Sequence, residues 1–231
     1  MGSSRQSIAV ITADVIASRR YSDADRRRLD RIVRAAFVDM NRRFPGTIQT
    51  MAAFRVTAGD EFQCVFGDLS RATRALTYLR AVAATGGLSP PIRFRASLGL
   101  GERSTAKRPN PYQEDGSAFA RSRQGLETLA ATRSPVRWTK FVTGREAVDD
   151  ASDAVLSLAD HLFQSWTVSQ WEAVRWTLLG ETRQEIAGRL EIAHQNVSKR
   201  LRAAGWSSLE PALDFLDRLL EGAGRTSNEV R

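Results

Sequence analysis

The stretch FRVTAGDEFQCVF, residues 54–66, contains two apolar, strand-like runs joined by a short acidic turn. Asp60 and Glu61 lie in that turn, directly before the second run. Two interpretations are open. Turns are often acidic for reasons of solvation and backbone geometry alone, but paired carboxylates can also hold a divalent cation. The choice depends on what the rest of the fold brings close to this turn.

The segments on both sides of this hairpin alternate between strand and helix patterns. Residues 7–18, SIAVITADVIAS, form a nearly continuous apolar run, which is typical of a strand covered on both faces. Residues 22–44 carry apolar side chains at spacings of three and four, which predicts an amphipathic helix. A second such helix over residues 70–84 and a strand over residues 92–101 follow the hairpin. The order βαββαβ predicts an α+β, ferredoxin-like fold, in which two helices cover one face of a four-stranded antiparallel sheet.

The remainder of the chain divides into two parts. A loop, a helix, a strand and a second helix are predicted over residues 102–116, 117–131, 137–144 and 145–163 in turn. From Trp166 onward the sequence has helical patterns only. We therefore expect an α+β domain over residues 1–164 and an all-helical domain over residues 165–231, ending in an amphipathic helix.

The predicted topology brings the acidic turn close to another carboxylate. In a sheet of this kind the third strand runs antiparallel beside the first, in the centre. Asp14 lies near the end of the first strand, and Asp60 and Glu61 open the third, so these carboxylates are expected to meet at one edge of the sheet. Like charges gathered there need neutralisation, either by arginines or by a cation such as Mg²⁺. Spacing alone leaves an ion-paired turn and a metal site equally open.

Composition restricts the classes of function. The 231 residues include 34 Lys and Arg against 26 Asp and Glu, a net charge of +8, which favours a polyanionic partner. The single cysteine, Cys64, excludes an internal disulfide and a multi-cysteine zinc site, and no histidine has a metal-ligand neighbour. No run approaches the roughly 20 apolar residues of a membrane span, and no secretory signal is present, so we expect a cytoplasmic protein without membrane contact. The sequence also lacks a glycine-rich phosphate loop and a Ser-His-Asp arrangement.

Two short helices in the C-terminal part have the spacing of a helix-turn-helix. Residues 182–185 form a capping box that begins the first helix, residues 191–193 make the turn, and the second helix runs over about 194–204. Val197 and Leu201 are expected to face inward. The polar and basic side chains on the outer face are His194, Gln195, Asn196, Ser198, Lys199, Arg200 and Arg202. Such side chains can contact the bases and phosphates of double-stranded DNA, although a solvated face or a protein-contact surface would have the same pattern.

ITADVIASRR (residues 11–20), followed by TAGDEFQCVF (residues 57–66), resembles the palm domains of class III nucleotidyl cyclases and diguanylate cyclases. This resemblance implies that the domain over 1–164 binds a nucleotide through Mg²⁺ or Mn²⁺. Asp14 and Asp60 would be the metal ligands, together with the backbone carbonyl of Val15. Glu61 would match the acidic fourth residue of the diguanylate-cyclase turn motif and is a candidate catalytic residue.

NPYQEDGSAFARSRQGLE, residues 110–127, is similar to the cyclase segment in which a glycine precedes a helix bearing Asn and Arg. By this resemblance, Arg121 or Arg123 would reach the phosphates, and both are candidate catalytic residues. The cyclase asparagine has no counterpart, because Phe119 or Ala120 occupies its place. The similarity therefore implies nucleotide binding more directly than cyclase turnover.

Taken end to end, the chain is similar to the SatD family. The matching features are ITADVIASR, AGDEFQ, RASLGLGE, NPYQEDGSAFARSR and the C-terminal helix-turn-helix. The helix-turn-helix also resembles those of sigma-factor region 4 and of response regulators, which implies DNA binding by residues 165–231.

Three functions are compatible with these features. The first is a cytoplasmic DNA-binding regulator whose palm domain binds a nucleotide or nucleotide signal with Mg²⁺. The second is an active nucleotidyl cyclase or nucleotidyltransferase that uses two metal ions. The third is a degenerate palm that acts only as a dimerisation scaffold for the DNA-binding part. Palm domains and helix-turn-helix units both often work as symmetric pairs, so a homodimer is expected in each case.

Overall fold

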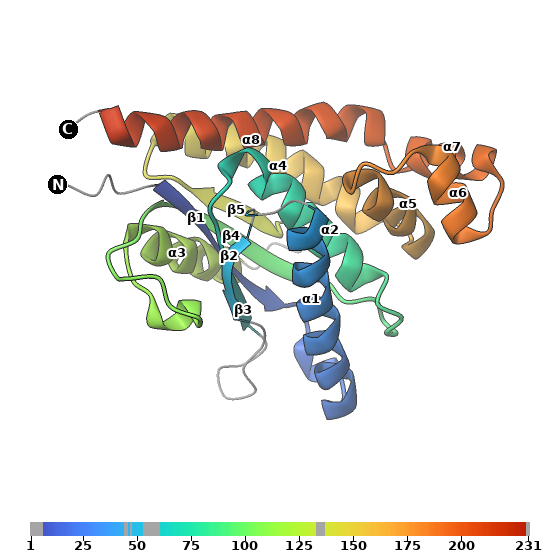
Figure 1. Cartoon of the computed structure of the whole chain (residues 1–231), viewed down its shortest axis with the longest axis horizontal. Helices are drawn as coiled ribbons and strands as arrows, with labels where there is room; N and C mark the ends of the chain where they lie inside the picture. Colours follow the sequence, from blue (N-terminus) through green and yellow to red (C-terminus); the bar gives the residue numbers. More distant parts are fainter. Residues whose placement is uncertain (1–6, 44–45, 47, 53–60, 133–136, 230–231) are drawn as a thin grey trace.

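The computed structural model describes residues 7–43, 46, 48–52, 61–132 and 137–229. Five strands form one sheet in the order β2-β3-β1-β4-β5 (Figure 1). Their bounds are β1 (Ser7–Val15), β2 (Ile48–Ala52), β3 (Glu61–Phe66), β4 (Phe94–Glu102) and β5 (Thr139–Val142). The central strand β1 pairs antiparallel with β3 and β4, and β2 pairs antiparallel with β3. The expected α+β class is confirmed.

The sheet differs from the expected one at its β4 edge. The expected sheet has four antiparallel strands, whereas the structure adds β5, which pairs parallel to β4. Parallel neighbours need a long crossover connection, and α3 (Ser117–Ala131) lies within that crossover. The sheet is therefore mixed.

Helices cover both faces of the sheet rather than one. Three helices cover the first face: α1 (Asp23–Arg43), α2 (Ala72–Ala84) and α4 (Glu146–Ser165). The three aromatic rings of Phe37, Phe62 and Phe94 pack edge to face in this layer, with ring centroids 6.3 and 5.1 Å apart. The opposite face is covered by α3, whose Ala118 and Phe119 belong to a separate small cluster with apolar side chains of β1 and β3.

Small residues allow α3 to lie directly on β4. A Cβ atom added at Gly99 would lie 2.2 Å from the carbonyl oxygen of Ala118, and one added at Gly101 would lie 2.4 Å from Ser117 Oγ. These distances are far below any non-bonded contact, so only glycine fits at either position. The alternation of RASLGLG therefore has a structural cause, since every second residue of β4 faces the helix.

The remaining helices form the C-terminal part of the chain. Their bounds are α5 (Val168–Leu178), α6 (Arg183–Leu190), α7 (His194–Ala203) and α8 (Trp206–Glu229). Figure 1 shows α5, α6 and α7 together at one end of the molecule, while α8 runs back along its length. One hydrophobic core continues from the sheet layer through Phe163, Trp166 and Trp171 into this helical part. The predicted domain boundary at 164/165 falls within that core, at the end of α4.

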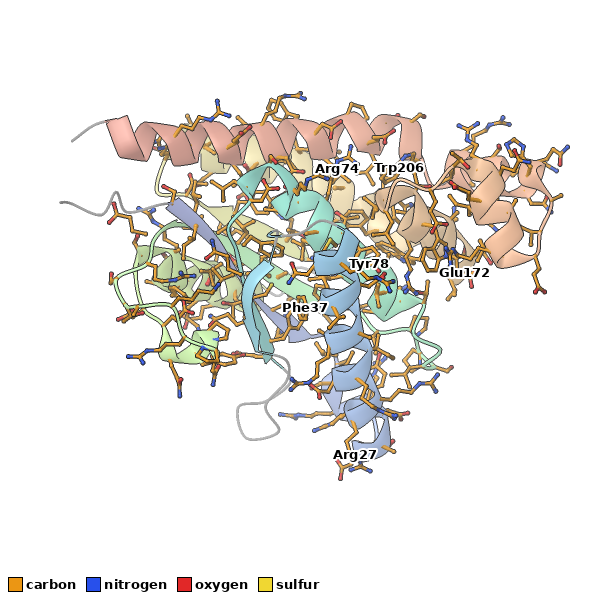
Figure 2. The ribbon with its side chains drawn as sticks, viewed as in Figure 1. Arg27, Phe37, Arg74, Tyr78, Glu172 and Trp206 are labelled. Carbon is orange, nitrogen blue, oxygen red and sulfur yellow. The ribbon has the colours of Figure 1, made fainter. Side chains whose placement is uncertain are left out.

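The long helix α8 is held against α2 by a partly exposed ion pair and a buried hydrogen bond. Arg74 on α2 binds Asp214 on α8 through its Nε and Nη2 atoms, at 2.9 and 2.5 Å, and Figure 2 shows Arg74 beside α8. Asp217 Oδ1 accepts a 2.7 Å hydrogen bond from the backbone N–H of Thr73, in the first turn of α2. Burial raises the pKa of Asp217 to about 7. The N-terminus of α2 is thus capped by a residue about 140 positions further along the chain.

Candidate functional site

The carboxylates expected to meet at the sheet edge are Asp14, Asp60 and Glu61, and the structure describes two of them. Asp14 on β1 lies directly opposite Glu61 on β3, and directly opposite Arg95 on β4. Residues directly opposite each other in antiparallel strands share a face. The structure therefore brings Asp14, Glu61 and Arg95 into one row across three strands. Asp60 lies outside the described residues.

Each of the two carboxylates is bound by an arginine. Asp14 accepts two hydrogen bonds from Arg95, from Nη2 at 2.5 Å and from Nε at 3.1 Å. Glu61 accepts a 2.7 Å hydrogen bond from Arg123 Nη1, contributed by α3. All four side chains remain between 23 and 41% exposed, so these are partly solvated ion pairs at the rim of the sheet. Neutralisation by arginine was one of the two alternatives open from the sequence, and it accounts for both described acids.

The structure separates the two candidate arginines of α3. Arg123 reaches the carboxylate row, but Arg121 donates from Nη1 to the carbonyl oxygen of Leu100 at 2.6 Å. Leu100 lies five residues along β4 from Arg95, about 17 Å at the usual rise of a strand. The structure therefore brings Arg123 to the carboxylates and places the Arg121 guanidinium at the backbone of β4.

Arg95 is the member of the row that was not among the site residues predicted from the sequence. A usable signal was present, because the predicted topology places the 92–101 strand beside the first strand. An arginine facing an aspartate there is a natural ion pair. Val15, whose backbone carbonyl is a candidate metal ligand, ends β1 and is 5% exposed. Within the described ranges, no three His, Cys, Asp or Glu side chains are grouped closely enough to hold a metal ion.

The second candidate site is the outer face of α7. The capping box at the start of α6 is confirmed, with Thr182 Oγ1 accepting from Glu185 N–H and the Glu185 side chain accepting from Thr182 N–H. The inward residues Val197 and Leu201 of α7 are buried as predicted. The chain turns between the helices through Glu191, which has a left-handed φ of 53°. The capping box thus fixes the start of α6, and the buried apolar side chains fix the inner face of α7.

Most of the predicted recognition residues are open to solvent. Exposed side chains of α7 include His194, Gln195, Asn196, Lys199 and Arg202. Ser198 is half-buried. No acidic residue occurs between Ile192 and Ala204. This face of α7 combines amide, imidazole and cationic groups without a competing carboxylate on the same helix.

Two contacts orient α7 relative to α5 and α4. Arg200 Nη1 binds Glu172 on α5 at 2.9 Å and the carbonyl oxygen of Ser169 at 3.4 Å, and Figure 2 shows Glu172 in this region. Trp166, directly after α4, donates from its indole Nε1 to the carbonyl oxygen of Ala204 at 2.9 Å. Arg200 is therefore a structural residue, and the outward cations of α7 are Lys199 and Arg202.

Comparison with known proteins identifies the family. No curated protein matches the chain. Each helix in the described part of the structure is too short or too polar to cross a bilayer. The model of the SatD family matches residues 7–209, which cover all five strands, α1 to α7 and the start of α8. The chain belongs to the SatD family.

Proposed function

We propose that this protein is a cytoplasmic DNA-binding regulator in which α6 and α7 act as a helix-turn-helix and α7 enters the major groove. The observation that carries this proposal is the outer face of α7, where exposed polar and cationic residues lie opposite the buried Val197 and Leu201. An α-helix fits the major groove, where each base pair presents a distinct pattern of donors and acceptors.

The side chains of this face have complementary roles in the proposal. Gln195 and Asn196 lie in the first turn of α7 and are exposed, which suits bidentate contacts to adenine. Lys199 and Arg202 lie further along and would bind phosphates or guanine, with His194 and Ser198 at the margin. The net charge of +8 adds a sequence-independent attraction to the phosphate backbone. A homodimer would place two copies of α7 on the half-sites of a palindromic operator.

Lys199→Ala and Asn196→Ala are expected to weaken DNA binding in different ways. Loss of Lys199 removes a phosphate contact, so affinity falls for all sequences and the salt dependence becomes shallower by about one unit of slope. Loss of Asn196 removes a base contact, so discrimination at one position falls by about 1–3 kcal/mol. Fluorescence anisotropy on a duplex selected from a randomised library would measure both effects.

Lys107→Ala is the matched control for this experiment, because it removes the same charge from an exposed loop residue away from α7. Its affinity should fall less than that of Lys199→Ala. If the Lys199 and Asn196 variants both bind duplex DNA like the parent, α7 is not the interface and the proposal fails.

We further propose nucleotide binding at the row formed by Asp14 and Glu61, because two acids and two arginines converge there at the rim of the sheet. Asp14, Asp60 and the carbonyl of Val15 would hold Mg²⁺ or Mn²⁺, and Arg123 would bind the phosphates. The described residues fit such an ion only in part, since Asp14 is engaged by Arg95 and would have to exchange it for the cation. When bound, the metal would polarise a phosphate.

Nucleoside triphosphate with Mg²⁺ is expected to raise the melting temperature of the parent protein. At a hundredfold excess over Kd the gain in stability is about 2.7 kcal/mol. Asp14→Asn should abolish this gain, while Asp150→Asn, an exposed acid of α4, should retain it. Release of pyrophosphate in the same assay would favour an active nucleotidyl cyclase or nucleotidyltransferase. Absence of any thermal shift would leave the sheet domain as a dimerisation scaffold.

A further inference from the structure

A cavity lies where the start of α5 meets the sheet layer. Its volume is about 250 Å³. Trp138, Trp166 and Trp171 form its aromatic walls together with Phe94, and two arginines, Arg80 and Arg93, complete the lining. Neither proposed function assigns a ligand contact to any of these side chains. The lining, as far as the structure describes it, contains no acidic residue.

Arg80 is a buried cation at this cavity. It is 4% exposed, and its guanidinium lies 4.7 Å from the ring centroid of Phe94 and 5.9 Å from that of Trp138. Nη1 and Nη2 donate to the carbonyl oxygens of Phe94 and Trp138 at 2.5 and 3.1 Å. Burial lowers its pKa to about 10, so the group stays charged at neutral pH. Its Nε–H is buried and has no hydrogen-bond partner within the described part of the chain.

The charges around the cavity do not cancel. Asp160 offsets Arg80 through Thr139, whose hydroxyl accepts from Arg80 Nη2 at 2.8 Å and donates to Asp160 Oδ1 at 2.7 Å. Arg93 is different: it is exposed and lies over the ring of Trp138, 5.5 Å from its centroid. Among the described residues, no carboxylate lies within ion-pair distance of Arg93. Among the charges that the structure describes here, that of Arg93 is therefore uncompensated, and it lies over the aromatic wall.

We propose that this cavity binds a small planar aromatic carboxylate. The indole walls would pack against the ring, and Arg93 would bind the carboxylate. Val168, 41% exposed, contributes apolar surface that the ring can cover. Ligand pockets usually measure about 300–1,000 Å³, so a cavity just below this range favours a one-ring or two-ring acid over a nucleotide.

The cavity is connected to α7 by a direct hydrogen bond. Trp166, one of its walls, donates to the carbonyl oxygen of Ala204 at the end of α7. Thr167 and Val168, which begin α5, also line it. A ligand that shifts Trp166 would change the position of α7, so its occupancy is expected to change DNA affinity. This regulatory consequence rests on the proposed function of α7, whereas ligand binding itself does not.

Benzoate is a suitable probe, with benzyl alcohol as its neutral counterpart. Three of the five tryptophans line the cavity, so tryptophan fluorescence reports directly on its occupancy. We expect benzoate to change this fluorescence saturably and benzyl alcohol to bind at least about tenfold more weakly, because a charge-assisted hydrogen bond is lost. Arg93→Gln should lower the affinity for benzoate by a similar factor. Arg218→Gln, which changes an exposed arginine of α8, should not.

The outcomes separate the two proposals. A fluorescence response to benzoate that does not saturate overturns the ligand site, and so does equal binding of benzoate and benzyl alcohol or an equal loss in Arg93→Gln and Arg218→Gln. The titration contains no DNA, so failure of DNA binding leaves it unaffected. Arg93 is exposed, so its variant is expected to fold, and circular dichroism checks this. A saturable benzoate response in a protein that also binds DNA allows the effect of benzoate on DNA affinity to be measured directly.

Discussion

Asp160→Ala is expected to lower the free energy of unfolding by about 3–5 kcal/mol, the usual cost of leaving a buried charge uncompensated. Asp160 is fully buried on α4. Its Oδ2 accepts hydrogen bonds from the backbone N–H groups of Trp138 and Thr139 at 2.7 and 2.8 Å. Alanine would leave both donors unsatisfied at the start of β5 and would leave Arg80 without its compensating charge. Chemical denaturation at neutral pH measures this loss.

Asp153→Ala is the matched control on the same helix. Asp153 is 29% exposed and pairs with Arg137 and Lys140, both at 2.9 Å. Loss of such a partly exposed pair should cost about 0–1 kcal/mol. A double variant, Arg80→Met with Asp160→Leu, should lose much less stability than the sum of its two single changes, because the buried charges are then removed together. A loss for Asp160→Ala no greater than that for Asp153→Ala would contradict the role assigned to this carboxylate.

Gly99→Val is expected to cost at least about 3 kcal/mol, at or beyond the upper end of what overpacking usually costs. The atoms that a side chain would meet are backbone atoms of α3, with Ala118 O at 2.2 Å and Ser122 N at 2.3 Å. Backbone atoms in a helix cannot rotate away as a side chain can, so α3 would have to leave the sheet. The hydrogen bond between Thr12 Oγ1 and Ser122 Oγ, 2.8 Å long, would be lost with it.

Gly188→Ala provides the opposite control. A Cβ atom added at Gly188 in α6 meets nothing within 4 Å. Alanine is favoured over glycine in a helix by about 0.5–1 kcal/mol, so this variant should be slightly more stable than the parent. Thermal unfolding of the two variants side by side tests the packing argument. If Gly99→Val melts within a few degrees of the parent, β4 and α3 are not in the close contact described above.

The element order and the meeting of the acids could be predicted from sequence for a physical reason. The periodicities of two and of three to four residues are strong in the first hundred positions, and the order βαββαβ has few ways to pair its strands. The antiparallel pairing of β1 with β3 then sets Asp14 beside Glu61. The inward face of α7 could be predicted for the same reason, since Val197 and Leu201 are four residues apart on one side of a helix.

Other features depend on how elements dock, which periodicity does not specify. Arg121 and Arg123 are two positions apart on α3 and point in different directions, so only the placement of α3 on β4 decides which one reaches the carboxylate row. That placement depends on Gly99 and Gly101, where α3 lies against β4. Their role in this contact cannot be predicted from the sequence until the packing helix is known. The parallel pairing of β5 could have been anticipated, because a strand-helix-strand order after β4 is a crossover unit.

The buried polar network was missed even though the sequence contains a signal for it. Arg80 interrupts the apolar run TYLRAVAA, and Asp160 interrupts SLADHLF. A charged side chain on the apolar face of a helix is uncommon unless it is paired. Two such residues on different helices are therefore candidates for one another, but the sequence alone gives no distance between them.

The continuous core that passes through Phe163, Trp166 and Trp171 has a practical consequence for experiments. An excised fragment beginning at residue 165 would retain the tryptophans but lose the partner surfaces of the sheet layer that cover them. Such a fragment would expose a large hydrophobic surface and would not reproduce the fold of the intact protein. The sheet layer and the C-terminal helices are therefore expected to unfold in a single thermal transition. Because no flexible joint separates them, a structural change in one part can be transmitted to the other.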